Sequence, residues 1–189
     1  MRITGGEMRG RRISPPSTRD VRPTPDAVRE SLFNLLPPVS GQTFLDLYAG
    51  SGIVGLEALS RGARCTVFVE KQAIIARKIR EQIAALGFEN SSLVLTMSVD
   101  KGVAALSRRE GRYDVIFADP PYEREWIIKT LHCCRRDDLL ATGGLLVLQR
   151  SVREKIEGMD GNHGFVAVDE RRYGDTVLTF LTHSLKETC

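Results

Sequence analysis

Two patterns of hydrophobic positions alternate along most of this chain. From Phe44 onward, short apolar runs alternate with longer stretches whose apolar residues recur every three or four positions. The short runs predict strands at 43–48, 65–69, 93–96, 113–118 and 145–149. The longer stretches predict helices near 53–61, 71–86, 100–107 and 125–137. This alternation is typical of a parallel sheet covered by helices, so the sequence predicts an α/β fold.

The two ends of the chain depart from that alternation. Prolines mark irregular chain up to Thr24, which we predict as the N-cap of a helix at about 25–36, with Pro25 in its first position. Near the other end, 165–168 and 176–182 flank a Tyr173-Gly174-Asp175 turn and predict an antiparallel pair of strands. A parallel core that ends in an antiparallel pair is therefore expected.

Composition indicates one globular domain without a membrane segment. The 189 residues are 42% hydrophobic and 27% charged, which is enough apolar material for a full core. No apolar run approaches the roughly 18 residues that a membrane span needs, and the first residues lack the apolar core of a signal peptide. We therefore expect a cytoplasmic protein. The four cysteines and three histidines show no metal-ligand spacing, so no metal is expected.

Positive charge is concentrated at the N-terminus. The net charge is only +3, but residues 1–22 carry six arginines against two acidic residues, and the remainder sums to about −1. The six are Arg2, Arg9, Arg11, Arg12, Arg19 and Arg22. We call residues 1–24 the arm. Two interpretations stay open from composition alone: a solvated arm, or one that contacts the phosphates of a nucleic acid.

A glycine-rich turn follows the first predicted strand. Gly50, Gly52 and Gly55 allow a sharp turn into a helix, whose free N–H groups favour a nucleotide-like ligand. Glu70, at the end of the next strand, is the carboxylate expected to hold ribose hydroxyls. This pattern alone does not separate NAD from S-adenosylmethionine. Asp46 favours the latter, because a carboxylate there would suit a methionine ammonium better than a pyrophosphate.

A second motif, Asp119-Pro120-Pro121-Tyr122, follows the strand predicted at 113–118. The Asp119 carboxylate and the Pro120 carbonyl can each accept one N–H of an exocyclic amine, which localises the nitrogen lone pair for methyl transfer. Tyr122 can stack on an unstacked base. In a parallel sheet the glycine-rich turn and this motif would open on the same edge, where ligands bind. The sequence therefore predicts transfer of a methyl group to an amine.

At this point the sequence resembles the RsmD-type guanine-N2 methyltransferases of bacterial small-subunit (16S) ribosomal RNA. The matching segments span nearly the whole chain in order. They are Met1–Gly6 with Arg9–Arg12, Arg22–Pro25 with Val28–Asn34, Asp46–Gly52 with Gly55–Leu59, Asp119–Tyr122, and Tyr173–Thr176. The glycine turn and Asp-Pro-Pro-Tyr alone indicate an amine methyltransferase. The Arg-Pro-Thr segment and the opening residues narrow the resemblance to this family.

The resemblance implies a Rossmann-like seven-stranded methyltransferase sheet with an antiparallel last strand, preceded by an N-terminal β-hairpin. The arm at 1–24 and a methyltransferase domain at 25–189 would form a single domain overall. The implied cofactor is S-adenosylmethionine, and the implied partner is 16S ribosomal RNA within a small-subunit particle. The resemblance also implies that the protein is a monomer and that it does not bind a membrane. The sequence departs from many methyltransferases after the third strand, where Ser98 stands in place of an aspartate and Asp100 follows, so the adenine contact stays open among Ser98, Val99 and Asp100.

The candidate site residues fall into three groups. The catalytic candidates are Asp119, Pro120 and Tyr122. The cofactor candidates are Asp46, Ala49, Gly50, Ser51, Gly52, Glu70, Lys71, Ser98 and Val99. The RNA candidates are Arg9, Arg11, Arg12, Arg22, Thr24 and Pro121. Two alternative functions remain: a methyltransferase acting on adenine or cytosine of DNA, and a small NAD-binding oxidoreductase or non-catalytic nucleotide-binding module.

Overall fold

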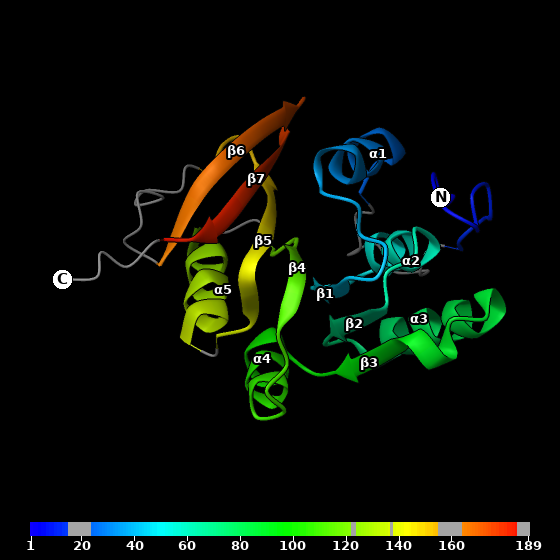
Figure 1. Cartoon of the computed structure of the whole chain (residues 1–189). Helices are drawn as coiled ribbons and strands as arrows, with labels where there is room; N and C mark the ends of the chain where they lie inside the picture. Colours follow the sequence, from blue (N-terminus) through cyan, green and yellow to red (C-terminus); the bar gives the residue numbers. More distant parts are fainter. Residues whose placement is uncertain (15–23, 122–123, 137, 155–163, 185–189) are drawn as a thin grey trace. The chain divides into compact units, whose positions relative to one another are not determined.

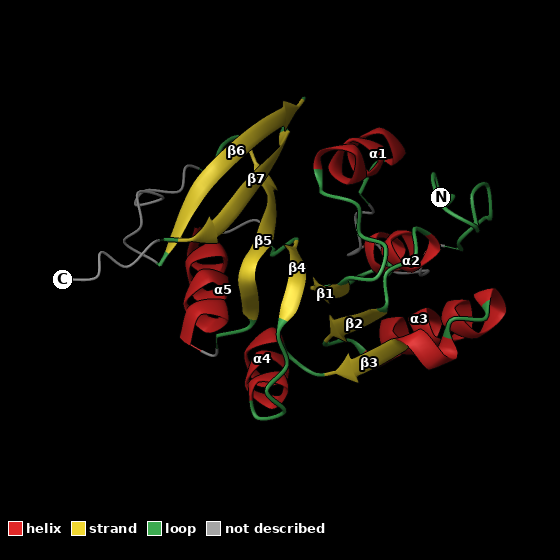
Figure 2. Ribbon diagram, in the orientation of Figure 1, coloured by secondary structure: helices red, strands yellow, loops and turns green. Residues whose placement is uncertain are grey.

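The computed structural model describes residues 1–14, 24–121, 124–136, 138–154 and 164–184. The chain divides into two compact units, Met1–Gly102 and Val103–Cys189. Seven strands form a sheet in the order β3-β2-β1-β4-β5-β7-β6, and Figure 2 shows the alternation of strands and helices along the chain. The predicted α/β fold is therefore confirmed. No helix in the described part of the chain is long and apolar enough to cross a membrane.

The first unit contains three parallel strands and the helices between them (Figure 1). Its elements are α1 (Asp26–Leu35), β1 (Thr43–Leu47), α2 (Ile53–Ser60), β2 (Cys65–Glu70), α3 (Ala73–Leu86), a short 3-10 turn (Glu89–Ser91), β3 (Ser92–Thr96) and the start of α4 (Val99–Ser107). β2 lies between β1 and β3, and Val67 of β2 pairs with Leu45 on one side and Leu93 on the other. The carboxyl ends of the three strands therefore share one edge.

The helices of this unit follow the predicted apolar stripes. On α3, Ile75, Ile79, Ile83 and Leu86 are all buried, and Gly87 ends the helix in the left-handed conformation at φ 77°. At α1 the predicted cap is wrong, because Pro25 rather than Thr24 is the N-cap residue. Pro25 has an extended backbone, and its carbonyl accepts the N–H of Arg29, so the helix begins one residue later than predicted.

The second unit begins in α4 and contains β4 (Tyr113–Ala118), α5 (Arg124–Arg136), β5 (Leu140–Ser151), β6 (Phe165–Tyr173) and β7 (Thr176–His183). β5 runs parallel to β4, and β7 runs antiparallel to both β5 and β6. β6 and β7 are joined by the two-residue turn Gly174-Asp175, in which glycine takes a φ of 59°. The predicted antiparallel end of the sheet is confirmed.

β5 is longer than its apolar run indicated. The prediction of 145–149 missed its first residues because Gly143 and Gly144 interrupt the hydrophobic pattern there. The pairing with β4 shifts register across this stretch, from Tyr113 opposite Leu140 to Val115 opposite Leu145. Gly143 has a φ of 76°, so a glycine-containing irregularity is built into the strand.

Candidate functional site

The turn after β1 depends on residues with positive φ. Gly50 and Gly52 take φ values of 51° and 74°, and Tyr48, which is not a glycine, takes 60°. Gly52 is also the N-cap of α2, in the left-handed conformation. Left-handed backbone is uncommon for a residue with a Cβ and occurs preferentially at functional sites. The turn therefore contains a third left-handed residue, Tyr48, in addition to its two glycines.

Gly55 serves packing rather than turning. A Cβ placed on this residue would lie 2.3 Å from an atom of the Phe68 ring on β2. Only a glycine at this position lets α2 come so close to the sheet. All eight residues of α2 are buried. The third glycine of the motif thus sets the distance between helix and strand.

Glu70 ties the end of β2 to the glycine turn. Its Oε2 accepts the N–H of Gly50 at 3.0 Å, and its Oε1 accepts the N–H of Gln72 at 2.8 Å. The residue is 6% exposed. A carboxylate can accept about four hydrogen bonds, so these two leave room for hydroxyl donors of a ligand. Lys71, the next residue, is exposed.

Asp46 has a contact that sequence reasoning missed. Its carboxylate is 2% exposed, and Oδ2 accepts the N–H of Gly55 at 2.9 Å. The side chain therefore supports the first turn of α2, where the helix has N–H groups without helical partners. Within the turn itself, the N–H of Ala49 bonds to the carbonyl of Val69, and Ser51 is buried. β1, β2 and the turn are thus joined by backbone and carboxylate contacts.

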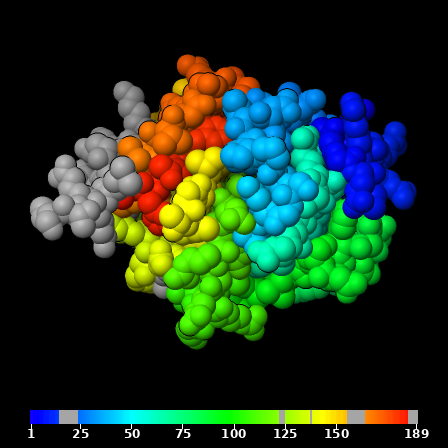
Figure 3. Space-filling view, viewed as in Figure 1, coloured from blue at the N-terminus to red at the C-terminus, as the bar shows by residue number. Residues whose placement is uncertain are grey.

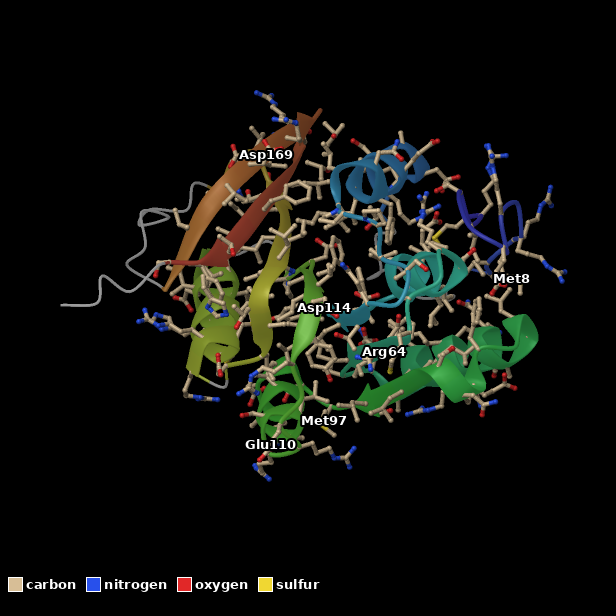
Figure 4. The ribbon with its side chains drawn as sticks, in the orientation of Figure 1. Met8, Arg64, Met97, Glu110, Asp114 and Asp169 are labelled. Atoms are coloured by element: carbon tan, nitrogen blue, oxygen red, sulfur yellow. The ribbon has the colours of Figure 1, made fainter. Side chains whose placement is uncertain are left out.

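The end of β3 leads into α4 through Met97 and Ser98 (Met97 is labelled in Figure 4). The N–H of Met97 bonds to the carbonyl of Glu70, and the carbonyl of Ser98 accepts the N–H of Gly102. A hydrogen bond from Ser98 lowers the pKa of Asp100 below its ordinary value. Ser98 is therefore engaged with α4, and Val99 is buried beside it.

The Asp-Pro-Pro segment follows β4 in the second unit. β4 is buried up to Ala118, Asp119 is half-buried, Pro120 is buried and Pro121 is exposed. Two consecutive prolines restrict this backbone and leave it without two N–H groups. Tyr122 lies outside the described residues. Of the two residues predicted to hold the amine, Asp119 is thus partly open to solvent and Pro120 is buried.

The described part of the arm, residues 1–14, is a folded hairpin rather than a solvated chain. Arg2 and Arg12 form an antiparallel bridge, with hydrogen bonds from Ile3 N–H to the Arg11 carbonyl and from Ile13 N–H to the Met1 carbonyl. Ile3 and Ile13 are buried. In Figure 3 the hairpin, in dark blue, lies against lighter blue and cyan residues of the same unit. We call residues 1–14 the arm hairpin.

Three arginines of the arm hairpin are open to solvent. Arg9, Arg11 and Arg12 are all exposed, and Figure 4 shows nitrogen-bearing side chains projecting from the hairpin that carries Met8. Arg22 lies outside the described residues. Thr24 is 5% exposed, and its carbonyl accepts a hydrogen bond from Arg29. Three of the RNA candidates are therefore exposed on one hairpin, and a fourth, Thr24, is buried.

Sequence reasoning missed a buried ion pair under the hairpin. Arg29 and Glu57 are both fully buried, with Arg29 Nε 3.2 Å from Glu57 Oε2. The signal was present in the sequence, since Glu57 interrupts the apolar stretch of α2 and Arg29 lies beside Val28 on the buried face of α1. A charge on an apolar helix face needs a partner of opposite charge.

Three comparisons place these features among known proteins. The family described as "Conserved hypothetical protein 95" matches residues 1–182. The protein named "Ribosomal RNA small subunit methyltransferase D" of Escherichia coli (strain K12) is 32% identical over 163 residues, covering 86% of this chain and 80% of its own. A solved E. coli structure described as a candidate methyltransferase has a TM-score of 0.85 at 27% identity, covering 97% and 98% of the two chains. A solved structure of a hypothetical protein from a Thermus species has a TM-score of 0.79 at 31% identity, covering 95% and 98%.

Proposed function

We infer the reaction from the family to which this chain belongs, that of "Conserved hypothetical protein 95" and the RsmD-type methyltransferases. We propose that the chain transfers a methyl group from S-adenosylmethionine to the exocyclic N2 amine of a guanine in 16S ribosomal RNA. The products are N2-methylguanine, S-adenosylhomocysteine and one proton. The family resemblance that the sequence predicted is confirmed, and this membership is the observation that carries the proposal.

The first unit has the groups that S-adenosylmethionine needs. When bound, this cofactor supplies an electrophilic methyl group on a sulfonium sulfur. Glu70 has acceptor capacity for ribose hydroxyls beside the turn of Ala49, Gly50, Ser51 and Gly52. Asp46 lies on β1, where its carboxylate accepts the N–H of Gly55 in the first turn of α2. We assign Lys71, Ser98 and Val99, at the ends of β2 and β3, to the rim of the same site.

The second unit supplies the groups for the amine. We propose that the Asp119 carboxylate and the Pro120 carbonyl each accept one N–H of the guanine N2 amine. Holding both hydrogens directs the nitrogen lone pair away from the ring and toward the methyl group. The amine becomes acidic only as the methyl transfers, so Asp119 acts mainly by alignment. Tyr122 and Pro121 would contact the face of the flipped base.

We propose that the arm binds the RNA phosphates through Arg9, Arg11, Arg12 and Arg22, with Thr24 fixing the end of the arm. Arginine suits this role because its planar fork binds phosphate at two points and also stacks on exposed bases. The finer parts of the proposal are that the substrate is the RNA within a small-subunit particle, that the enzyme acts as a monomer, and that it does so in the cytoplasm.

The test uses the purified full chain with isotopically labelled S-adenosylmethionine and small ribosomal subunits from a strain that lacks the gene. Nucleoside digests of the RNA should contain labelled N2-methylguanine, and mapping should locate it at one guanine. Labelled N6-methyladenine or N4-methylcytosine would overturn the substrate assignment. Calorimetric binding of NAD without binding of S-adenosylmethionine would overturn the reaction itself.

A further inference from the structure

The buried carboxylate of Glu57 is fully occupied by hydrogen bonds. Oε2 accepts the N–H of Thr4 at 2.7 Å and the Nε–H of Arg29 at 3.2 Å. Oε1 accepts the hydroxyl of Thr4 at 2.8 Å and the Nε–H of Arg61 at 2.9 Å. These four bonds use the whole acceptor capacity of a carboxylate. Half of them come from Thr4, so Glu57 holds the arm hairpin directly to α2.

Arg29 binds the arm at two further points. Its guanidinium donates to the carbonyl of Arg2 near the start of the arm hairpin and to the carbonyl of Thr24 at the end of the arm. It also donates to Asp26 at 3.0 Å. One buried side chain on α1 therefore ties both ends of the arm to the helix that follows it.

Ser60 supplies a second contact point on α2. Its hydroxyl donates to the carbonyl of Gly5 at 2.7 Å and accepts the N–H of Met8 at 3.0 Å, while its carbonyl accepts the N–H of Glu7 at 2.8 Å. The approach is so close that a Cβ on Gly6, where φ is 76°, would lie 1.8 Å from the Ser60 carbonyl oxygen. α2 therefore contacts the hairpin at Gly5, Glu7 and Met8 as well as at Thr4.

A buried ion pair adds little net stability to the loop that it holds. Desolvating two charges offsets most of their attraction, and well-packed apolar residues would serve stability as well. Hydrogen bonds differ from apolar contacts in that they fix direction and position. Here the pair binds named backbone groups of the arm, so it specifies a single placement of the hairpin and hence of its exposed arginines.

We propose that Arg29, Glu57 and Ser60 are positioning residues for RNA binding, which hold the arm hairpin in its binding conformation without contacting RNA themselves. The proposal rests on the proposed function, because it assumes that the arm arginines bind RNA. A hairpin fixed beforehand loses less conformational entropy when RNA binds, so its release lowers affinity while the arginines remain in place.

The experiment compares Ser60→Ala and Glu57→Gln with the unaltered protein, and Ser60→Ala serves if Glu57→Gln does not fold. Each should weaken binding of small-subunit RNA by about five-fold or more through lost preorganisation, with affinity for S-adenosylmethionine within about two-fold. Amide exchange at Gly10 and Ile13, whose N–H groups bond within the hairpin, should accelerate. The matched control is Thr179→Val in the second unit, which also removes a buried hydroxyl that makes two hydrogen bonds.

A double-mutant cycle separates positioning from general loss of stability. In a background of Arg9→Ala, Arg11→Ala and Arg12→Ala, Ser60→Ala should weaken RNA binding no further, because the contacts that it positions are already gone. Equal weakening in both backgrounds, or a Thr179→Val effect as large, would overturn the proposal. Normal RNA binding by the arginine variant would instead overturn the proposed role of the arm, so the two failures are distinguishable.

Discussion

Two buried carboxylates near α2 each hold a loop, and they differ in how many of their acceptor positions are occupied by hydrogen bonds from the protein. Beside the glycine turn that precedes α2, Glu70 accepts two backbone N–H groups. On α2 itself, Glu57 accepts four hydrogen bonds, two of them from Arg29 and Arg61. Both side chains are almost fully buried. Burial alone therefore does not separate a binding carboxylate from a structural one.

The difference lies in unused acceptor capacity. Glu70 can still accept hydroxyl donors, whereas every acceptor position of Glu57 is occupied by protein. Glu57 also has charged partners, so removing it leaves a buried guanidinium with reduced compensation, while removal of Glu70 frees backbone amides only. The comparison predicts that loss of Glu57 mainly lowers stability and that loss of Glu70 mainly lowers ligand affinity.

The largest effect is expected from Glu57→Ala. It leaves the Nε–H of Arg29 and the N–H of Thr4 without their acceptor. Breaking a buried pair from one side costs about 3–5 kcal/mol of the free energy of unfolding. Urea denaturation measures this change. Glu81→Ala on α3 is the control, since Glu81 forms an exposed pair with Lys78 and its loss should change the free energy of unfolding little. Similar losses in the two variants would contradict the structural role of Glu57.

Asp119→Ala extends the comparison to a carboxylate whose partner is proposed to be the substrate. Turnover should fall on the order of 100-fold or more, as it does when a preorganised hydrogen-bond partner of the reacting group is removed. Affinity for S-adenosylmethionine should stay within about a few-fold, because the proposed cofactor site uses other residues. Asp119→Asn keeps one acceptor oxygen and should retain more activity than alanine. Near-normal turnover in Asp119→Ala would refute the proposed amine clamp.

Glu70→Ala is expected to have a smaller effect, on binding. Affinity for S-adenosylmethionine should fall by about 1–3 kcal/mol through loss of charge-assisted hydrogen bonds to the ribose. Isothermal titration calorimetry gives this value, and urea denaturation should show a smaller loss of stability than for Glu57→Ala. Unchanged cofactor affinity would assign the ribose to another residue.

The sequence predicted those features that local pattern determines. The α3 stripe of Ile75, Ile79 and Ile83 has helical periodicity, and the turn at Gly50 has its own residue signature, so both were recognised correctly. The features that the sequence did not predict depend on contacts between residues far apart in the chain. The three residues that donate hydrogen bonds to Glu57 come from three separate segments, and the contact from Asp46 to Gly55 depends on how α2 packs against β1. The periodicity of hydrophobic residues does not predict these contacts between distant segments.

The hydrophobic pattern also failed to predict the full length of the edge strand β6. Prediction ended the β6 strand at Val168, but the strand continues through Asp169, Glu170 and two arginines to Tyr173. Charged residues on an exposed edge mask the apolar signal, and only the ladder with β7 holds them in strand conformation. The pairing of these charged residues with β7 can be seen only in the structure.

The smallest effect per residue is expected at the arm arginines, which are exposed, in contrast to the buried residues that hold the hairpin. Changing Arg9, Arg11 and Arg12 together to alanine should weaken RNA binding several-fold. Each lost phosphate contact flattens the plot of log affinity against log salt by about 0.7, so the slope should fall by up to about 2. Affinity for S-adenosylmethionine should be unchanged.

The matched control changes Arg108, Arg109 and Arg112, three exposed arginines of the second unit, and removes the same charge elsewhere. A fall in slope confined to the arm variant would show local phosphate contacts, since a general charge effect would appear in both variants. An unchanged slope in a folded, cofactor-binding arm variant would show that these arginines are only a solvated face.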